Sequence, residues 1–94
     1  MMYKYEVIRS AQFNRELKRA KKRGFNIEKL DAVVDQLRKN IPLEQKYHDH
    51  DLQGEYKGFR ECHISSDWLL IYIKDEDELI LFLARTGTHS DLFD

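Results

Sequence analysis

Two almost unbroken apolar runs, at residues 69–73 and 79–83, constrain the fold of this chain more than any other feature. Apolar runs of this length, rich in Leu and Ile, are typical of strands that lie inside a sheet, buried on one face and partly covered on the other. Only a short acidic segment separates the two runs, and a short connection joins neighbouring antiparallel strands. The sequence therefore predicts an antiparallel pair of strands in the middle of a sheet.

Periodicity and capping residues predict the other elements. Ser10 and Asn26 are suited to cap the N-termini of two amphipathic helices, and Gly24 stands where the first helix is expected to end. In chain order, the predicted elements are a strand at 3–8, helices at 11–23 and 27–40, and strands at 59–64, 68–74 and 78–85. This order predicts an α+β fold in which a two-helix hairpin packs on one face of a four-stranded, mainly antiparallel sheet.

Length and composition limit the class of protein. The 94 residues support one modest hydrophobic core, so we expect a single domain, 1–94. A hydrophobic content of 41% argues against disorder, and no run approaches the roughly 20 apolar residues of a membrane-spanning helix. The single cysteine, Cys62, permits no internal disulfide, and the first residues lack the apolar core of a signal peptide. We therefore expect a cytoplasmic protein without a membrane partner.

Charge is segregated along the chain. Residues 1–47 contain 12 Lys and Arg against 6 Asp and Glu, whereas residues 48–94 contain 4 against 11 together with all four histidines. Such a pattern suggests a basic segment that holds an anionic polymer beside a region rich in proton-transfer groups, although solvated charge on helix faces explains many of the lysines. The basic residues of the first predicted helix are Arg15, Lys18, Arg19, Lys21, Lys22 and Arg23.

Five side chains that suit acid–base chemistry stand at the ends of predicted elements: His50, His63, Asp67, Arg85 and His89. Two histidines on opposite sides of a phosphodiester can divide the work of base and acid, because imidazole changes its charge near neutral pH. An arginine can stabilise the extra negative charge of a pentacoordinate phosphorane. RNA supplies its own nucleophile, the 2'-OH, so this set indicates a ribonuclease that needs neither metal nor cofactor.

Two aromatic residues next to this set have two interpretations each. Trp68 lies either in the core or against a substrate base. Phe93 lies in a polar tail, where it either docks on the fold or stacks on an RNA base, a contact worth roughly 1–3 kcal/mol.

A different class of site is also compatible with the residues. His48-Asp49-His50-Asp51 places imidazole and carboxylate groups at alternate positions, which suits zinc, manganese or iron in an extended segment. This alternative predicts a metal-dependent nuclease, but the sequence offers no clear third or fourth ligand.

At these residues the chain resembles the YafQ family of bacterial toxins, mRNA endonucleases of the RelE/ParE superfamily of type II toxin–antitoxin systems. The resemblance extends over essentially the whole chain and is most specific in its second half. One departure is Asp51, where relatives often have proline. The matching stretches are His48-Asp49-His50, Leu52, Gly54, Tyr56-Lys57-Gly58, residues 60–64, residues 67–72 and residues 85–93.

The resemblance implies a ribosome-dependent endoribonuclease that cuts translated mRNA in the ribosomal A site. His50 would take the 2'-OH proton and His89 would protonate the leaving 5'-oxygen, or the reverse. Arg85 would stabilise the phosphorane, and His63 with Asp67 facing it across the turn would position the nucleophile or tune His50.

The resemblance also implies partners. Phe93 and Trp68 would contact the substrate, and the basic residues of the first helix would contact ribosomal RNA on the 70S ribosome. The cognate antitoxin would be DinJ-like, with a ribbon-helix-helix DNA-binding part. The alternative within the superfamily is a ParE-like toxin or binding module that cuts no RNA.

Overall fold

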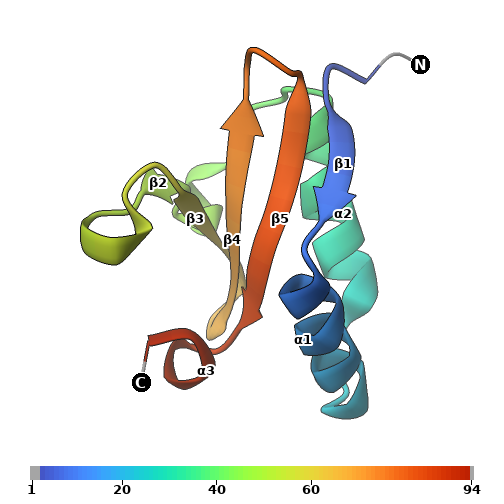
Figure 1. Ribbon diagram of the computed structural model, residues 1–94. Coiled ribbons are helices and arrows are strands. Elements are labelled where there is room, and N and C mark those ends of the chain that lie inside the picture. The colour runs from blue at the N-terminus through green and yellow to red at the C-terminus, as the bar shows by residue number, and fades with distance from the viewer. Residues whose placement is uncertain (1–2, 94) are drawn as a thin grey trace.

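One five-stranded sheet, in the order β1-β5-β4-β3-β2, organises the protein (Figure 1). The computed structural model describes residues 3–93. In chain order its elements are β1 (Glu6–Arg9), α1 (Ala11–Lys22), α2 (Ile27–Arg38), η1 (Gln45–Tyr47), β2 (His50–Asp51), η2 (Gly54–Tyr56), β3 (Arg60–Ser65), β4 (Trp68–Asp75), β5 (Ile80–Gly87) and α3 (His89–Phe93), where η marks a 3-10 turn.

The predicted α+β fold is confirmed, with one more strand than expected. Strands β4 and β5 are antiparallel and occupy interior positions, as their apolar runs predicted, and β1 pairs with β5 in parallel while the other pairs are antiparallel. The prediction of four strands is wrong because β2 has only two residues, His50 and Asp51, which is too short to show a period. Its backbone pairs with β3 within residues 41–58, where the sequence predicts neither a helix nor a strand.

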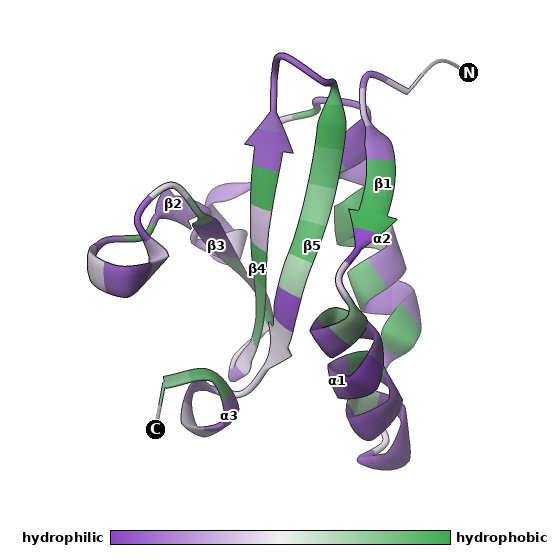
Figure 2. Cartoon of the chain, viewed as in Figure 1, coloured by the Kyte–Doolittle hydropathy of each residue, from purple (hydrophilic) through white to green (hydrophobic). Residues whose placement is uncertain are grey.

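The two faces of the sheet carry separate apolar clusters. Helices α1 and α2 cover one face, where Phe13, Leu17 and Leu30 pack against residues such as Leu70 and Leu83. The opposite face is covered in part by α3, whose Leu92 packs against Leu69, Ile71 and Ala84. In Figure 2, β1 and β5 are largely hydrophobic (green), whereas α1 is mostly hydrophilic (purple). This second face is the less covered one, so it is the face on which a large substrate has access.

Helix α1 is attached to β5 by its cap. The Ser10 hydroxyl accepts a hydrogen bond from the Phe13 backbone N–H at 2.9 Å and donates one to the Ala84 carbonyl at 2.7 Å. Gly24 follows the helix with φ of 81°, a left-handed conformation that costs glycine little. Both predicted helix boundaries are therefore confirmed to within a few residues.

The C-terminal tail contains a short helix that its sequence pattern did not reveal. In α3, Thr88 and Asp91 form a reciprocal cap: the Thr88 hydroxyl accepts from the Asp91 N–H at 3.1 Å, and the Asp91 carboxylate accepts from the Thr88 N–H at 2.9 Å. A helix of five residues is too short for apolar periodicity, so capping is the only local signal for it. Among residues 3–93, no helix is long and apolar enough to cross a membrane.

Candidate active site

The register of the sheet places four residues in one row on the open face. His50 of β2 lies opposite Glu61 of β3, Glu61 lies opposite Ile71 of β4, and Ile71 lies opposite Arg85 of β5. Directly opposed residues of antiparallel strands point to the same face. Ile71 belongs to the apolar cluster of the open face, so His50, Glu61 and Arg85 share that face.

Arg85 reaches this face because of a β-bulge. The pairing of β4 with β5 shifts between Ile71 and Tyr72, and Ala84 is the extra residue on β5. Without the bulge, Arg85 would follow the alternation of Leu81 and Leu83 and point toward the helices. The bulge therefore moves a guanidinium from the buried face to the open one.

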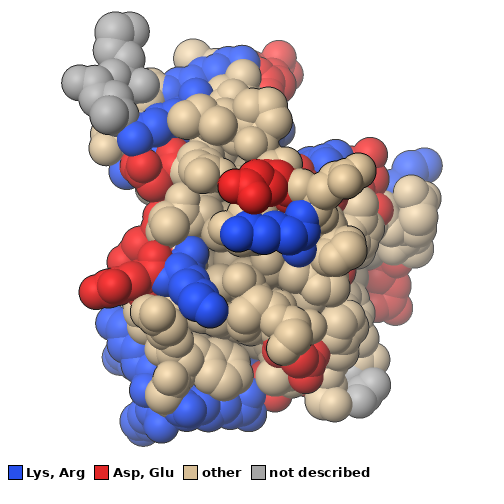
Figure 3. Space-filling view, turned by 180° about the vertical axis from the view of Figure 1, so that it is seen from behind, with Lys and Arg blue, Asp and Glu red and all other residues tan. Residues whose placement is uncertain are grey.

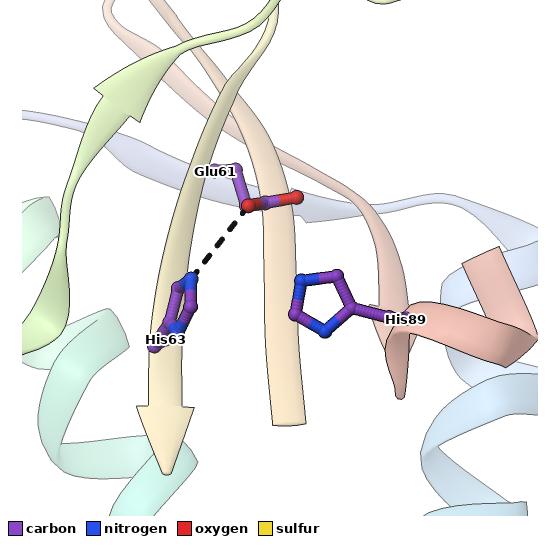
Figure 4. Close-up of side chains that lie close together, drawn as sticks. All are labelled: Glu61, His63 and His89. Carbon is purple, nitrogen blue, oxygen red and sulfur yellow. Dashed lines mark ion pairs between the residues drawn. The ribbon is translucent and has the colours of Figure 1, made fainter. Parts of the chain in front are cut away.

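Three imidazoles surround the buried carboxylate of Glu61, and we name His50, His63 and His89 with Glu61 the histidine cluster. Figure 4 shows Glu61, His63 and His89 of this cluster. Glu61 Oε1 lies 3.5 Å from His50 Nε2 and 3.8 Å from His63 Nε2, and the Glu61 side chain is only 6% exposed. One ligand atom each of Glu61, His63 and His89 lies within 4.8 Å of the others. The cluster confirms that the three predicted histidines converge.

Asp67 orients His89 and not His63. Its carboxylate Oδ1 accepts hydrogen bonds from the His89 backbone N–H at 3.1 Å and lies 2.8 Å from His89 Nδ1. These two bonds from His89 lower the pKa of Asp67. The expectation that Asp67 faces His63 across the turn is wrong, because α3 folds back over the β3–β4 turn and brings His89 to the carboxylate. With Nδ1 turned to Asp67, Nε2 of His89 is left for a substrate.

His63 and His50 differ in their surroundings. Burial lowers the pKa of His63, and its imidazole neighbours add to this effect while Glu61 opposes it. These surroundings favour the neutral form of His63. Nδ1 of His50 lies 2.6 Å from the His48 carbonyl oxygen, so Nε2 is the nitrogen that faces Glu61.

Arg85 is held in place by a buried carboxylate that sequence analysis did not identify. Glu16 of α1 accepts from Arg85 Nη2 at 2.6 Å and from Nε at 3.2 Å, and Arg85 Nη1 donates to the Tyr56 hydroxyl at 3.0 Å. The Glu16 bonds raise the pKa of Arg85. These bonds use three of the five N–H donors of the guanidinium, which keeps two for a phosphate. Phe93 packs edge-on against Tyr56 with ring centroids 5.8 Å apart, yet 45% of it is exposed.

Trp68 belongs to the core. Only 3% of it is exposed, its ring packs against Phe25, and its indole N–H donates to the Thr86 hydroxyl at 2.8 Å. Assigning Trp68 to substrate binding is therefore wrong, and the core interpretation is confirmed. Cys62 is likewise fully buried, and burial raises the pKa of its thiol.

The alternative metal site in the segment 48–51 does not form. Asp49 accepts a hydrogen bond from the Tyr72 hydroxyl at 2.5 Å and pairs with Arg60, and Asp51 pairs with the same Arg60 at 2.6 Å. Both carboxylates are thus directed to Arg60 and away from a shared ion. The group among the described residues that could hold a metal is instead Glu61, His63 and His89.

The basic residues of α1 divide into two groups. Arg23 binds the Asp91 carboxylate of α3 at 2.6 Å, and Arg19 lies 3.6 Å from it, so these two fasten α3 to α1. The other four predicted phosphate contacts form no ion pair within residues 3–93; they are Arg15, Lys18, Lys21 and Lys22. Figure 3 shows the Lys and Arg side chains of α1 gathered at the lower left of the rear face.

Sequence reasoning missed Glu61 and Glu16. Glu61 had a usable signal, because it stands two residues before His63 and alternate residues of a strand share one face. Glu16 had none, because its partner Arg85 is 69 positions away in the sequence.

Comparisons with known proteins identify the family of this chain. The family described as the bacterial toxin of type II toxin–antitoxin system YafQ matches residues 5–94. The mRNA interferase toxin YafQ of Escherichia coli strain K12 is 42% identical over 93 residues, which is 98% of this chain and 99% of that protein.

Solved structures show the same fold. The toxin in the crystal structure of the E. coli DinJ-YafQ toxin–antitoxin complex has a TM-score of 0.87 and 38% identity, covering 97% of this chain and 99% of that one. A metal-bound toxin from Helicobacter pylori has a TM-score of 0.89 and 43% identity, covering 98% and 100%. The protein described here belongs to the YafQ family of bacterial toxins of type II toxin–antitoxin systems.

Proposed function

We propose that this protein is an endoribonuclease that cuts translated mRNA in the ribosomal A site by metal-independent acid–base catalysis. The observation that carries the proposal is the histidine cluster: three imidazoles gather around one buried carboxylate on the open face, and Asp67 fixes the orientation of one of them. The mRNA interferase activity named for the E. coli relative supports the same reaction.

The roles follow from the contacts. His50 takes the proton of the 2'-OH at Nε2, and the imidazolium formed lies 3.5 Å from Glu61, which stabilises its charge. The 2'-oxygen attacks the phosphorus, and the bond to the 5'-oxygen breaks to leave a 2',3'-cyclic phosphate. His89, whose Nδ1 lies 2.8 Å from Asp67 Oδ1, donates a proton from Nε2 to the leaving 5'-oxygen. The reverse division between His50 and His89 uses the same geometry.

His63 and Arg85 assist the same reaction. Burial favours the neutral form of His63, which can hydrogen-bond the 2'-OH without adding charge. Arg85 directs its remaining N–H donors to the phosphorane oxygens. Phe93, exposed beside Tyr56, stacks on a base of the mRNA.

The partners and compartment belong to the same proposal. Arg15, Lys18, Lys21 and Lys22 contact phosphates of ribosomal RNA, which makes ribosome binding salt-sensitive. A DinJ-like antitoxin with a ribbon-helix-helix part neutralises the toxin, as the E. coli complex suggests. All of these partners are found in the cytoplasm, where we place the protein.

Primer extension on translated mRNA after induction tests the proposal. We expect cuts within codons for the native protein and none for His89→Ala, while circular dichroism shows the same fold for both proteins. Growth arrest with intact mRNA would refute the ribonuclease and favour a ParE-like mode of action.

A further inference from the structure

A cavity of about 600 Å³ lies beside the histidine cluster, between α2, η1 and the turn that joins β3 to β4. His63 is the residue that the cavity and the cluster share, since it lines the cavity while Glu61 and His89 do not. The His63 ring has its centroid 5.1 Å from that of His48, another lining residue, and 5.9 Å from that of His89. The cavity therefore begins where the histidine cluster ends.

The lining of this cavity is cationic. Lys29 of α2 and Lys46 of η1 supply the positive charge, and the described lining residues include no carboxylate. The imidazoles of His48 and His63 and the Ser65 and Ser66 hydroxyls add polar groups to the same lining. The cavities along α1 and α2 differ, because Glu6, Asp31 and Asp35 line one of them and Glu16 and Asp91 line another. An anion in the cavity beside the histidine cluster therefore meets positive charge that no lining carboxylate neutralises, whereas the other two cavities contain carboxylates.

The ion pairs nearby leave both lysines available. Lys46 lies 3.9 Å from Glu44, but both side chains are about two-thirds exposed, and such a pair contributes little. Among residues 3–93, Lys29 forms no ion pair. Carboxylates of the described residues therefore do not neutralise the charges of Lys29 and Lys46, and both side chains are free to bind an anion.

The backbone at the cavity rim is strained. His48 adopts φ of 48° and ψ of 45°, the left-handed region that non-glycine residues rarely adopt. This conformation ends η1 and brings the His48 ring against His63. Strain of this kind concentrates at ligand sites.

We propose that this cavity binds the nucleotide next to the scissile bond, with Lys29 and Lys46 on its phosphate and the Ser65 and Ser66 hydroxyls on its sugar–phosphate backbone. The inference rests on the proposed ribonuclease function and deepens it. A single-stranded RNA bound at the histidine cluster continues past His63, and the cavity offers the first set of phosphate donors on that side. The cavity therefore binds the mRNA next to the bond that is cut.

Steady-state cleavage on programmed ribosomes tests the proposal with the double variant Lys29→Ala/Lys46→Ala. We expect KM to rise about tenfold with kcat nearly unchanged, since a lost phosphate contact removes binding and not chemistry. Binding of a non-cleavable 2'-O-methyl RNA trinucleotide should also lose salt dependence, with the log–log slope falling by about 0.7 for each lost contact. The control is Lys39→Ala, which removes one lysine charge near the other end of α2, outside the cavity, and so also matches each single variant, Lys29→Ala and Lys46→Ala.

The outcomes separate the two proposals. If the native protein does not cut mRNA but the trinucleotide binds with the expected salt dependence, the ribonuclease fails and the RNA subsite stands. If the native protein cuts and the double variant matches Lys39→Ala in both KM and salt slope, the subsite is refuted alone. Unchanged cleavage with weakened antitoxin binding would also refute it, because the cavity would then belong to the antitoxin interface.

Discussion

Replacing Glu61 with Gln removes the charge at the centre of the histidine cluster while keeping the shape of the side chain. Glu61 Oε1 lies 3.8 Å from His63 Nε2, and the two side chains are 6% and 24% exposed. Coulomb's law at this distance gives about 4 kcal/mol for an effective dielectric constant of 20 and about 1 kcal/mol in water. Even the lower of these two energies is large enough to change the protonation equilibrium of the His63 imidazole measurably.

We expect Glu61→Gln to lower the pKa of His63 further, because Glu61 is the group that opposes the effect of burial there. Loss of the partner 3.5 Å from His50 Nε2 should also slow cleavage at neutral pH by roughly tenfold or more. An NMR titration of the histidine ring protons measures the pKa in the free protein, and single-turnover cleavage on ribosomes measures the rate.

Asp51→Asn is the matched control. It removes the carboxylate of the residue that follows His50, and this carboxylate is 73% exposed and pairs with Arg60. It should leave the His63 titration and the cleavage rate close to those of the native protein. A Glu61→Gln protein whose His63 titrates as in the native protein, or at higher pH, would refute the electrostatic role of Glu61.

Four further predictions concern residues that position the site, the pH dependence of stability and the effect of metal ions. Asp91→Ala should lower the free energy of unfolding by about 1–2 kcal/mol in urea titrations and slow cleavage, because it removes both the α3 cap and the Arg23 contact. Glu16→Gln should cost roughly 3 kcal/mol and lower kcat, whereas adding Arg85→Met should restore stability but not kcat. The pKa of His63 is lowered in the folded state, so the unfolded chain binds a proton more readily than the folded one as the pH falls. The free energy of unfolding should therefore fall as the pH drops below about 6.5, and His63→Gln should reduce that fall in urea titrations. EDTA should leave cleavage unchanged, and excess Zn²⁺ should inhibit it by occupying the histidine cluster; loss of activity in EDTA would contradict the metal-independent reaction.

Local pattern was sufficient for much of the fold. Apolar runs, helix stripes and the caps at Ser10 and Asn26 are encoded within a few residues, so the two long helices and the central β4–β5 pair followed from them. The elements that escaped are short: β2 and α3 contain too few residues to show a period. Their positions depend on pairing and packing with distant segments.

For the candidate site, the sequence by itself determined which titratable groups exist. Their places at the ends of predicted elements and the resemblance to the YafQ family indicated that several of them serve one site. Tertiary structure alone decided their partners. It assigned Asp67 to His89, directed the Asp49 and Asp51 carboxylates to Arg60, buried Trp68, and turned Arg85 to the open face through a bulge that Glu16 supports. The physical reason is range: propensity and periodicity act over a few residues, whereas hydrogen bonds and ion pairs join side chains that only the folded sheet brings within 4 Å of one another.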